Sequence, residues 1–320
     1  MTSTPDSQRY VVITPCRDEE DHLPRTIETV AAQTCPPTLW IIVDDGSTDA
    51  TPRILSEAQE RHDFIRVVRR ENRGRRAVGP GVIEAFYAGL EQVDLDAFDY
   101  LCKLDADLIV PPRYFERLVA EMSREPRLGT VSGKVFTCDP DGTKHHEIRG
   151  DENSVGPSKF YRVEAFRDIG GFARTVGWDG IDGHVCRLKG WIAKSIMDEE
   201  LQLLHLRQMG SSDKNVLRGR VRGGLGLWTI GYSPLWVIAR SINRLRERPY
   251  ILGAMCTLWG YFAAMATRKP RVDDPPYQRY MRKFQRDALL RGKRFAAEWW
   301  HELARETPHT KAPPPAETDT

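Results

Sequence analysis

The 320-residue sequence lacks several patterns that would place it in a narrow class. Its six cysteines include no CxxC pair and no spacing typical of a disulfide framework. This favours reduced, mostly buried thiols in a reducing compartment. The first ten residues (MTSTPDSQRY) contain no apolar signal segment, so we expect the catalytic part to stay in the cytoplasm. The formal net charge is only +2 and no internal repeat is visible, so overall charge does not indicate a nucleic-acid binder.

Strand and helix patterns alternate through the first half of the chain. Short β-branched or apolar runs predict strands at 10–14, 39–43, 64–68, 100–104 and 130–136. Helical spacing predicts helices at 23–34, 50–61, 78–90 and 113–123, whereas 137–157 is polar and indicates a loop. This alternation predicts an α/β fold with a mostly parallel sheet and helices on both faces. Ligands bind such sheets at the carboxyl ends of the strands.

Acidic side chains follow two of these predicted strands. Asp44 and Asp45 follow the second strand, where they could accept hydrogen bonds from a nucleobase or ribose, although a solvated turn with a helix cap would also explain them. Asp105 and Asp107 follow the fourth strand, and positions i and i+2 of extended backbone point the same way. Converging carboxylates favour Mg²⁺ or Mn²⁺ bridging a diphosphate, with an ordinary acidic loop as the alternative.

Two later segments carry further candidate side chains. Asp179 and Asp182 lie in WDGIDGH before a predicted helix, and either could take a proton from an acceptor hydroxyl or simply cap the helix. His205 and Arg207 follow another predicted strand. The imidazole could complete a metal shell and the guanidinium could pair with phosphate oxygens, although a lone His-x-Arg is often structural.

Four motifs, in this order and spacing, resemble those of glycosyltransferase family 2, which has the GT-A fold. They are TPCRDEE at 14–20, VDDGSTD at 43–49, NRG at 72–74 and LDAD at 104–107. The resemblance spans roughly residues 9–210. It implies inverting transfer of a sugar from a nucleoside-diphosphate donor, most often a UDP-sugar, with Mg²⁺ or Mn²⁺ as cofactor.

The resemblance also implies roles for individual residues. Those near the nucleotide would be Pro15, Arg17, Glu19, Asp44, Asp45, Arg73 and Asp105. Asp107 would be the metal ligand proper, with Asp105 close to ribose or metal. In the family, a Glu-Asp motif holds the catalytic base, but Trp178 stands here where its Glu would be. Counting back eleven residues from Gly190 gives Asp179 as the base, and Asp182 is the alternative.

The last third of the chain is basic and aromatic. Two uncharged stretches, 223–239 and 249–267, contain 17 and 19 residues between flanking arginines. These lengths are marginal for a membrane span, which needs about 20 mostly apolar residues, and positive charge on both sides disfavours one. We therefore expect helices lying on an anionic membrane surface. Packing onto the catalytic domain, dimer formation and one true span are the alternatives.

These observations predict a GT-A catalytic domain at 9–215, a helical membrane-associating region at 216–308, and disordered ends at 1–8 and 309–320. The expected reaction is transfer of a sugar to an acceptor, favoured to be a lipid-linked saccharide in cell-envelope polysaccharide assembly, on the cytoplasmic face of the plasma membrane. A nucleotidyltransferase and a non-catalytic scaffold are the other candidates. Arginines near residue 73 and after 218 would suit a nucleic acid, but no aromatic platform or known module accompanies them.

Overall fold

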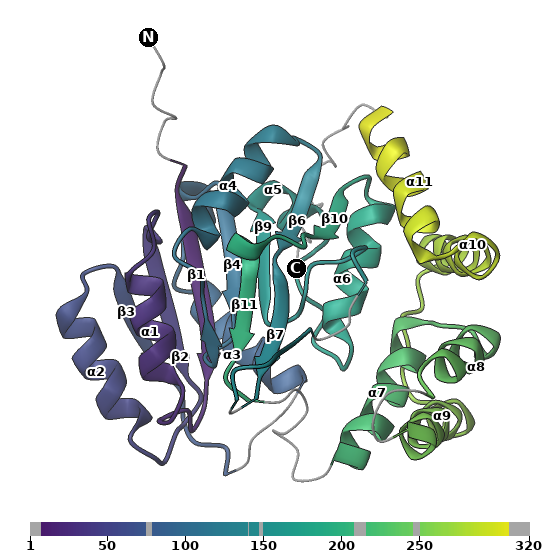
Figure 1. Cartoon of the computed structure of the whole chain (residues 1–320), viewed down its shortest axis with the longest axis horizontal. Coiled ribbons are helices and arrows are strands. Elements are labelled where there is room, and N and C mark those ends of the chain that lie inside the picture. Colours follow the sequence, from purple (N-terminus) through teal and green to yellow (C-terminus); the bar gives the residue numbers. More distant parts are fainter. Residues whose placement is uncertain are drawn as a thin grey trace, which may run out of the picture.

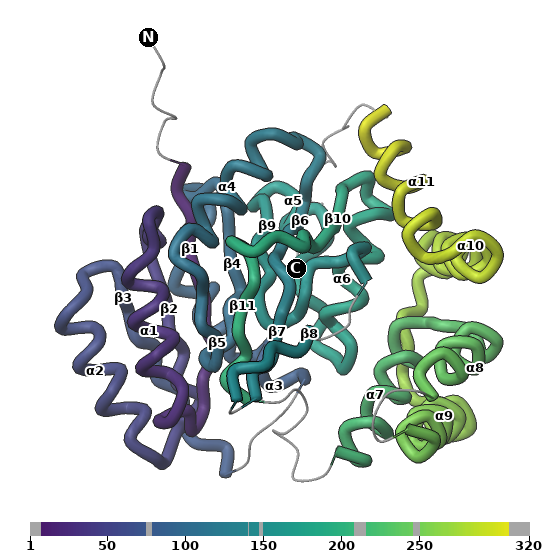
Figure 2. Tube along the Cα trace, viewed as in Figure 1, coloured from purple at the N-terminus to yellow at the C-terminus, as the bar shows by residue number. Residues whose placement is uncertain are grey.

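The computed structural model describes residues 8–74, 79–139, 141–146, 150–207, 216–245 and 250–306. The predicted disordered ends lie outside these residues, apart from Gln8, and so does the predicted domain boundary at 215. Two sheets form the centre of the molecule, and the helices within residues 216–306 gather on one side of them (Figures 1 and 2).

The larger sheet has seven strands in the order β10-β6-β9-β4-β1-β2-β3. All neighbouring strands are parallel except β9, which runs antiparallel to both β4 and β6. The strands are β1 (Tyr10–Cys16), β2 (Leu39–Asp44), β3 (Ile65–Arg69), β4 (Tyr100–Leu104), β6 (Leu128–Ser132), β9 (Ser158–Arg162) and β10 (Ile192–Ser195). This arrangement confirms the predicted α/β class with a mostly parallel sheet.

Helices cover both faces of this sheet because successive strand residues point to opposite sides. Val12 packs in one apolar cluster with residues of α1, α2 and α4, while its neighbour Val11 packs in another with residues of α3, α5 and α6. The helices are α1 (Leu23–Ala31), α2 (Thr51–Arg61), α3 (Pro80–Leu90), α4 (Tyr114–Arg124), α5 (Val163–Asp168) and α6 (Trp178–Leu188), with short 3₁₀ turns η1 (Leu95–Ala97) and η2 (Glu199–Leu201).

The predicted strand at 130–136 is in fact two strands in different sheets. The chain leaves the larger sheet after β6 and enters the smaller one as β7 (Lys134–Cys138). Gly133 lies at the break, where any Cβ would overlap the Leu201 carbonyl oxygen, so the backbones can meet only at glycine. The smaller sheet, in the order β5-β11-β7-β8, also contains β5 (Leu108–Ile109), β8 (Lys144–His146) and β11 (Gln202–His205).

The carboxyl-terminal helices pack onto the two-sheet part of the molecule through α6. They are α7 (Val216–Ile230), α8 (Pro234–Asn243), α9 (Tyr250–Ala266), α10 (Pro275–Arg291) and α11 (Lys293–Glu306). The buried His184 of α6 forms 2.9 Å hydrogen bonds with the Tyr280 and Tyr232 hydroxyls. Helices α7 and α9 touch backbone to backbone at Gly224 and Gly260. Of the helices in the described residues, none combines the length and apolar character that crossing a bilayer requires.

Two buried histidines, His184 on α6 and His301 on α11, predict that the protein loses stability in mild acid. Burial lowers the pKa of His184 well below its usual value, and burial lowers that of His301 to about 3. Both are neutral in the folded state, whereas the unfolded chain binds protons below about pH 6.5. The free energy of unfolding therefore keeps its full value above pH 6.5. Below pH 6.5, each of the two histidines lowers it by about 1.4 kcal/mol per pH unit. Urea unfolding at pH 7.5 and 5.5 measures the drop.

The His301→Gln variant separates this effect from ordinary carboxylate titration. It should unfold with a shallower dependence on pH than the wild type between pH 6.5 and 5. An unchanged dependence would mean that His301 is not held neutral by the fold.

Candidate active site

The candidate residues gather because the parallel strands of the larger sheet end at the same level. Cys16 at the end of β1 lies opposite Asp44 at the end of β2, and Asp44 lies opposite Arg69 at the end of β3. Pro15 is half-buried one position earlier, opposite Val43. The loops after these strands open at the lower side of the molecule in Figure 1, because β1 runs downward from the amino terminus.

Arg17 ties the loops after β1, β2 and β3 together. Its Nη1 donates to the Asp45 main-chain oxygen at 2.8 Å and its Nη2 to Asn72 Oδ1 at 2.6 Å. Asp44 Oδ1 accepts from the Ser47 amide at 2.8 Å, so this carboxylate closes its own turn. Arg17 and Asp44 therefore shape the candidate nucleotide site, and much of their hydrogen-bonding capacity is already used within the chain.

Asp45 is the carboxylate that these loops place at the candidate nucleotide site. Its side chain is 9% exposed and forms ion pairs with Arg70, at 2.7 Å, and with Arg73. Arg73 also pairs with Glu84 of α3. Asp45 is thus flanked by two guanidinium groups, a combination that suits a ligand carrying both anionic groups and hydroxyl or N–H donors.

The Asp-x-Asp motif meets the end of β11, which lies in the other sheet. His205 Nε2 lies 3.2 Å from Asp107 Oδ2, and Arg207 Nε lies 2.5 Å from the same oxygen. Arg207 Nη2 also reaches Glu19 Oε1 at 2.7 Å. Burial raises the pKa of Asp107, but the hydrogen bond and charge of His205, together with Arg207, outweigh it and lower the pKa to about 2. Asp107 is thus ionised at neutral pH.

Asp105 is engaged differently from Asp107. The Nζ of the buried Lys103 forms an ion pair with Asp105 and donates to the Gly156 carbonyl at 3.0 Å. The Asp105 side chain keeps 29% of its surface exposed. It remains accessible to a ligand hydroxyl or a cation, with part of its charge already balanced by the lysine.

The donor set fits a divalent cation that takes its other ligands from a bound diphosphate. Across the described residues, no cluster of three or more His, Cys, Asp or Glu side chains is placed to hold a metal ion. Asp107 and His205 nevertheless supply one carboxylate and one imidazole in direct contact. Mg²⁺ and Mn²⁺ sites of phosphate-transferring and related enzymes use one or two protein ligands plus phosphate oxygens. Such a site would hold the metal weakly until the nucleotide binds.

The two candidate bases lie on α6 in contrasting surroundings. Asp182 is fully buried, its Oδ2 lies 2.7 Å from the Lys159 ammonium, and the same oxygen accepts from the Tyr161 hydroxyl at 2.5 Å. This burial disfavours Asp182 as the base. Asp179 is half-buried in the first helical turn. Its Oδ2 would be only 3.0 Å from a Cβ on Gly156, so it faces the loop that also contacts Lys103.

Neither aspartate caps α6. The N-cap is Gly177, with φ of +80° and no side chain of its own to cap the helix. Ile230 at the end of α7 packs against Gly177 and Gly180. The carboxyl-terminal helices therefore support the turn that carries Asp179.

Sequence analysis missed the buried lysines of the site. Lys103 and Lys159 lie on adjacent strands, β4 and β9, and place their ammonium groups 5.2 and 5.8 Å from the Trp178 ring centre. Lys159 also donates to the Asp179 main-chain oxygen at 3.0 Å. A signal was available for Lys103, because it interrupts an otherwise apolar strand (YLCKL), whereas Lys159 lies in a strand with other polar residues (SKFYR).

Comparisons with known proteins agree with this architecture. The family model described as "Glycosyl transferase family 2" matches residues 11–178. A poly-beta-1,6-N-acetyl-D-glucosamine synthase of Staphylococcus aureus (strain MSSA476) is 33% identical over 119 residues, covering 37% of this chain and 26% of the relative. The Staphylococcus epidermidis synthase is 29% identical over the same length. The match thus spans about a quarter of these curated relatives.

Solved structures resemble the fold across most of the chain. The mannosyltransferase PcManGT from Pyrobaculum calidifontis, in complex with GDP-Man and Mn²⁺, has a TM-score of 0.51 and 18% identity, covering 93% of this chain and 86% of its own. S. aureus TarS 1–349 with UDP-GlcNAc has a TM-score of 0.52 and 14% identity, covering 93% and 92%. GalNAc-T7 with UDP, GalNAc and Mn²⁺ reaches 0.55 at 14% identity, covering 90% and 58%. At these identities the likeness establishes a GT-A-like fold.

Proposed function

This chain belongs to glycosyl transferase family 2 and is a glycosyltransferase, and from that premise we propose that it moves a sugar from a UDP-sugar to an acceptor hydroxyl with inversion at the anomeric carbon. The observation that carries the proposal is the meeting of Asp107, His205 and Arg207 from two sheets, beside the loops that follow β1–β3. The UDP-GlcNAc complex of TarS and the Mn²⁺ complexes of two structural neighbours support the choice of ligands.

In this proposal Asp45, held by Arg70 and Arg73, accepts hydrogen bonds from the uridine, and Asp105 accepts from ribose or assists the metal. Asp107 and His205 would hold Mn²⁺ or Mg²⁺, and the ion would supply positive charge to stabilise a departing diphosphate. Arg207 lies close enough to Asp107 to add positive charge there.

The proposed chemical step uses Asp179. Its carboxylate takes the proton of the acceptor hydroxyl while that oxygen forms a bond to the anomeric carbon. The bond from this carbon to the diphosphate breaks on the opposite side, so the configuration inverts and the nucleoside diphosphate leaves. Lys159 keeps the first turn of α6 in place through the Asp179 main-chain oxygen.

Calorimetric titration with UDP, GDP and dTDP, first with Mn²⁺ and then with EDTA, tests the donor assignment. We expect UDP to bind in the micromolar range with Mn²⁺ and at least about tenfold more weakly with EDTA, since Asp107 and His205 would hold the ion and the ion would attract the diphosphate. Preference for GDP or dTDP would correct the donor class. Failure of well-folded protein to bind any of the three would contradict the catalytic assignment.

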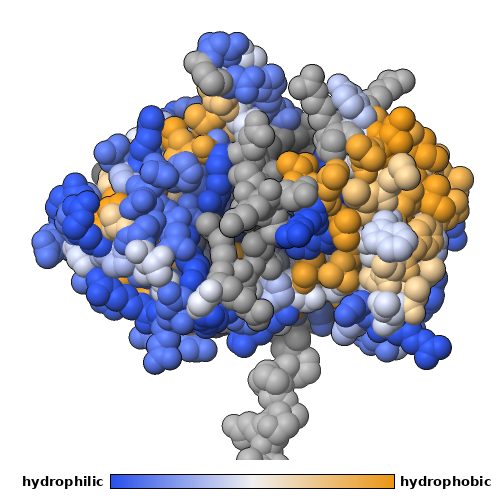
Figure 3. Space-filling model, turned by 90° about the horizontal axis from the view of Figure 1, so that it is seen from below, coloured by the Kyte–Doolittle hydropathy of each residue, from blue (hydrophilic) through white to orange (hydrophobic). Residues whose placement is uncertain are grey.

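We further propose that the acceptor is lipid-linked and that the protein works on the cytoplasmic face of the plasma membrane. Exposed apolar side chains gather on α8 and α9: Leu235, Ile238, Ile242, Ile251, Leu252, Met255 and Trp259. We call this set the apolar face. Figure 3, seen from the side on which the sheet's parallel strands end, has hydrophobic residues gathered at one side of that view. Residues 214–272 contain eleven Lys and Arg and one acidic residue, Glu247, which suits an anionic leaflet.

Vesicle flotation tests the apolar face. The protein should bind vesicles of phosphatidylglycerol and phosphatidylcholine, and the Ile251→Ser/Trp259→Ser variant should bind at least about tenfold more weakly, because two side chains lose apolar burial. Leu290→Ser is the matched control, since Leu290 is 76% exposed on α10, a helix that contributes no residue to this face. Equal binding by the double variant would contradict the proposal. A wild-type dimer that the double variant cannot form would assign the face to a second copy.

A further inference from the structure

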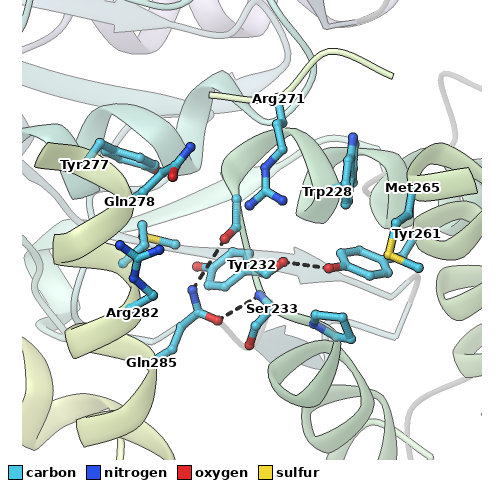
Figure 4. A pocket seen from close by; sticks show the side chains of 13 residues that line it. Trp228, Tyr232, Ser233, Tyr261, Met265, Arg271, Tyr277, Gln278, Arg282 and Gln285 are labelled. Atoms are coloured by element: carbon cyan, nitrogen blue, oxygen red, sulfur yellow. Dashed lines mark hydrogen bonds between the residues drawn. The ribbon is translucent and has the colours of Figure 1, made fainter. Parts of the chain in front are cut away.

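A cavity of about 410 Å³ lies among the carboxyl-terminal helices, apart from the residues of the candidate active site. Trp228, Tyr261 and Met265 come from α7 and α9, Tyr277 and Arg282 come from α10, and residues 231–234 close the remaining side. In Figure 4 the aromatic and thioether side chains of α7 and α9 stand on one side, and Arg282 stands on the other. Arg271, from the segment before α10, reaches down between them.

The polar groups of the cavity walls are largely satisfied within the protein. The Tyr261 hydroxyl donates to the Tyr232 main-chain oxygen at 2.7 Å, and the Tyr277 hydroxyl donates to the Ile230 oxygen at 2.9 Å. The Trp228 indole N–H donates to the Lys269 oxygen at 2.8 Å. These rings therefore offer mainly apolar surface to a ligand, and recognition by hydrogen bonds falls to other lining residues.

The two arginines are the lining groups that remain for a polar ligand. Arg271 stacks its guanidinium 4.6 Å from the centre of the Trp228 ring, which leaves the N–H edges of the group available. Arg282 forms no hydrogen bond or ion pair with any described residue, and no carboxylate lines the cavity. Two guanidinium groups at one cavity, without an acidic counterpart in its walls, attract an anion, and guanidinium binds phosphate through two parallel hydrogen bonds.

The cavity and the apolar face share helices α8 and α9. The lining residue Pro234 precedes Leu235, which is 68% exposed, and the lining residue Met265 lies on the same helix as Ile251 and Trp259. A ligand with a phosphate between the arginines could therefore extend apolar chains over this face. We propose that the cavity binds the phosphate headgroup of an anionic membrane lipid, at a site separate from that of sugar transfer. The proposal rests on the membrane association proposed above.

Calorimetry with dihexanoyl phosphatidylglycerol, below its micelle concentration, tests the cavity without a membrane. The wild type should bind this lipid, and Arg271→Gln/Arg282→Gln should bind it at least about tenfold more weakly, because both phosphate contacts are lost. Arg279→Gln is the matched control: Arg279 is an exposed arginine of α10 that does not line the cavity. Unchanged affinity in the double variant would overturn the proposal, and so would equally tight binding of inorganic phosphate, which would assign the site to a soluble ligand.

Two further measurements separate this proposal from those on which it rests. UDP titration of the Arg271→Gln/Arg282→Gln variant should match the wild type, and a loss there would reveal a folding or active-site defect and overturn the separation of the two sites. The Ile251→Ser/Trp259→Ser variant should lose vesicle binding and still bind the short-chain lipid. If the wild-type protein binds the short-chain lipid but no vesicles, the headgroup site in the cavity would be supported and the proposed membrane association would be refuted.

Discussion

Replacement of Asp107 by alanine is expected to remove the Mn²⁺-dependent part of UDP binding and to lower turnover of the UDP-sugar at least about a thousandfold. This carboxylate lies 3.2 Å from His205 Nε2, so the cation would lose the anionic ligand that adjoins the imidazole. Metal ions contribute several kcal/mol of charge stabilisation to such reactions, and about 4 kcal/mol corresponds to a thousandfold in rate. Calorimetry with and without EDTA, and release of UDP from the sugar donor, measure the two effects.

The fold should tolerate this change. Arg207 keeps its ion pair with Glu19 and its side chain is 25% exposed, so loss of the Asp107 charge does not leave a fully buried cation. Asp63→Ala, an exposed aspartate at the start of the turn before β3, is the control and should behave as the wild type. Near-normal turnover by the Asp107→Ala variant, or UDP binding that still responds to Mn²⁺, would refute the metal assignment.

The position of the site at the carboxyl ends of the parallel strands could be predicted from the sequence, because each strand is recognisable from its own short run of apolar residues. The short apolar runs that became β1, β2 and β4 are each followed by a charged motif. Parallel pairing then brings Asp44 and Arg69 to the same edge without further information. The family resemblance, now confirmed by the match over residues 11–178, rested on the order of these motifs.

Contacts between distant segments could not be predicted in the same way. Nothing near Gly133 in the sequence indicates that Leu201 approaches it. One strand was therefore predicted at 130–136, where the structure has two, β6 and β7. Arg207 was expected to face phosphate, yet it also bridges Asp107 and Glu19, which lie 100 and 188 residues earlier in the chain. Such pairings depend on how two sheets meet, which periodicity does not encode.

Counting back from Gly190 favoured Asp179 over Asp182 as the base, and the burial of Asp182 favours the same choice. Asp182 pairs with Lys159, both side chains are fully inaccessible, and Tyr161 donates to the same carboxylate oxygen. A group in this position cannot receive a proton from a substrate hydroxyl without breaking a buried ion pair. Its replacement should therefore act on stability, whereas replacement of Asp179 should act on the reaction.

We expect Asp179→Asn to bind UDP as the wild type does and to transfer sugar about 10²–10⁴-fold more slowly, because a general base of this kind supplies that factor. Asp182→Asn should lower the free energy of unfolding by about 3–5 kcal/mol, since it leaves the Lys159 charge buried without its partner. Asp182→Asn/Lys159→Met removes both charges and should recover much of that stability. Stable Asp182→Asn protein that binds UDP but does not transfer sugar, beside an active Asp179→Asn variant, would move the base to Asp182. The buried lysine would then hold a catalytic carboxylate in place. Its bond to the Asp179 main chain indicates instead that it supports the start of α6.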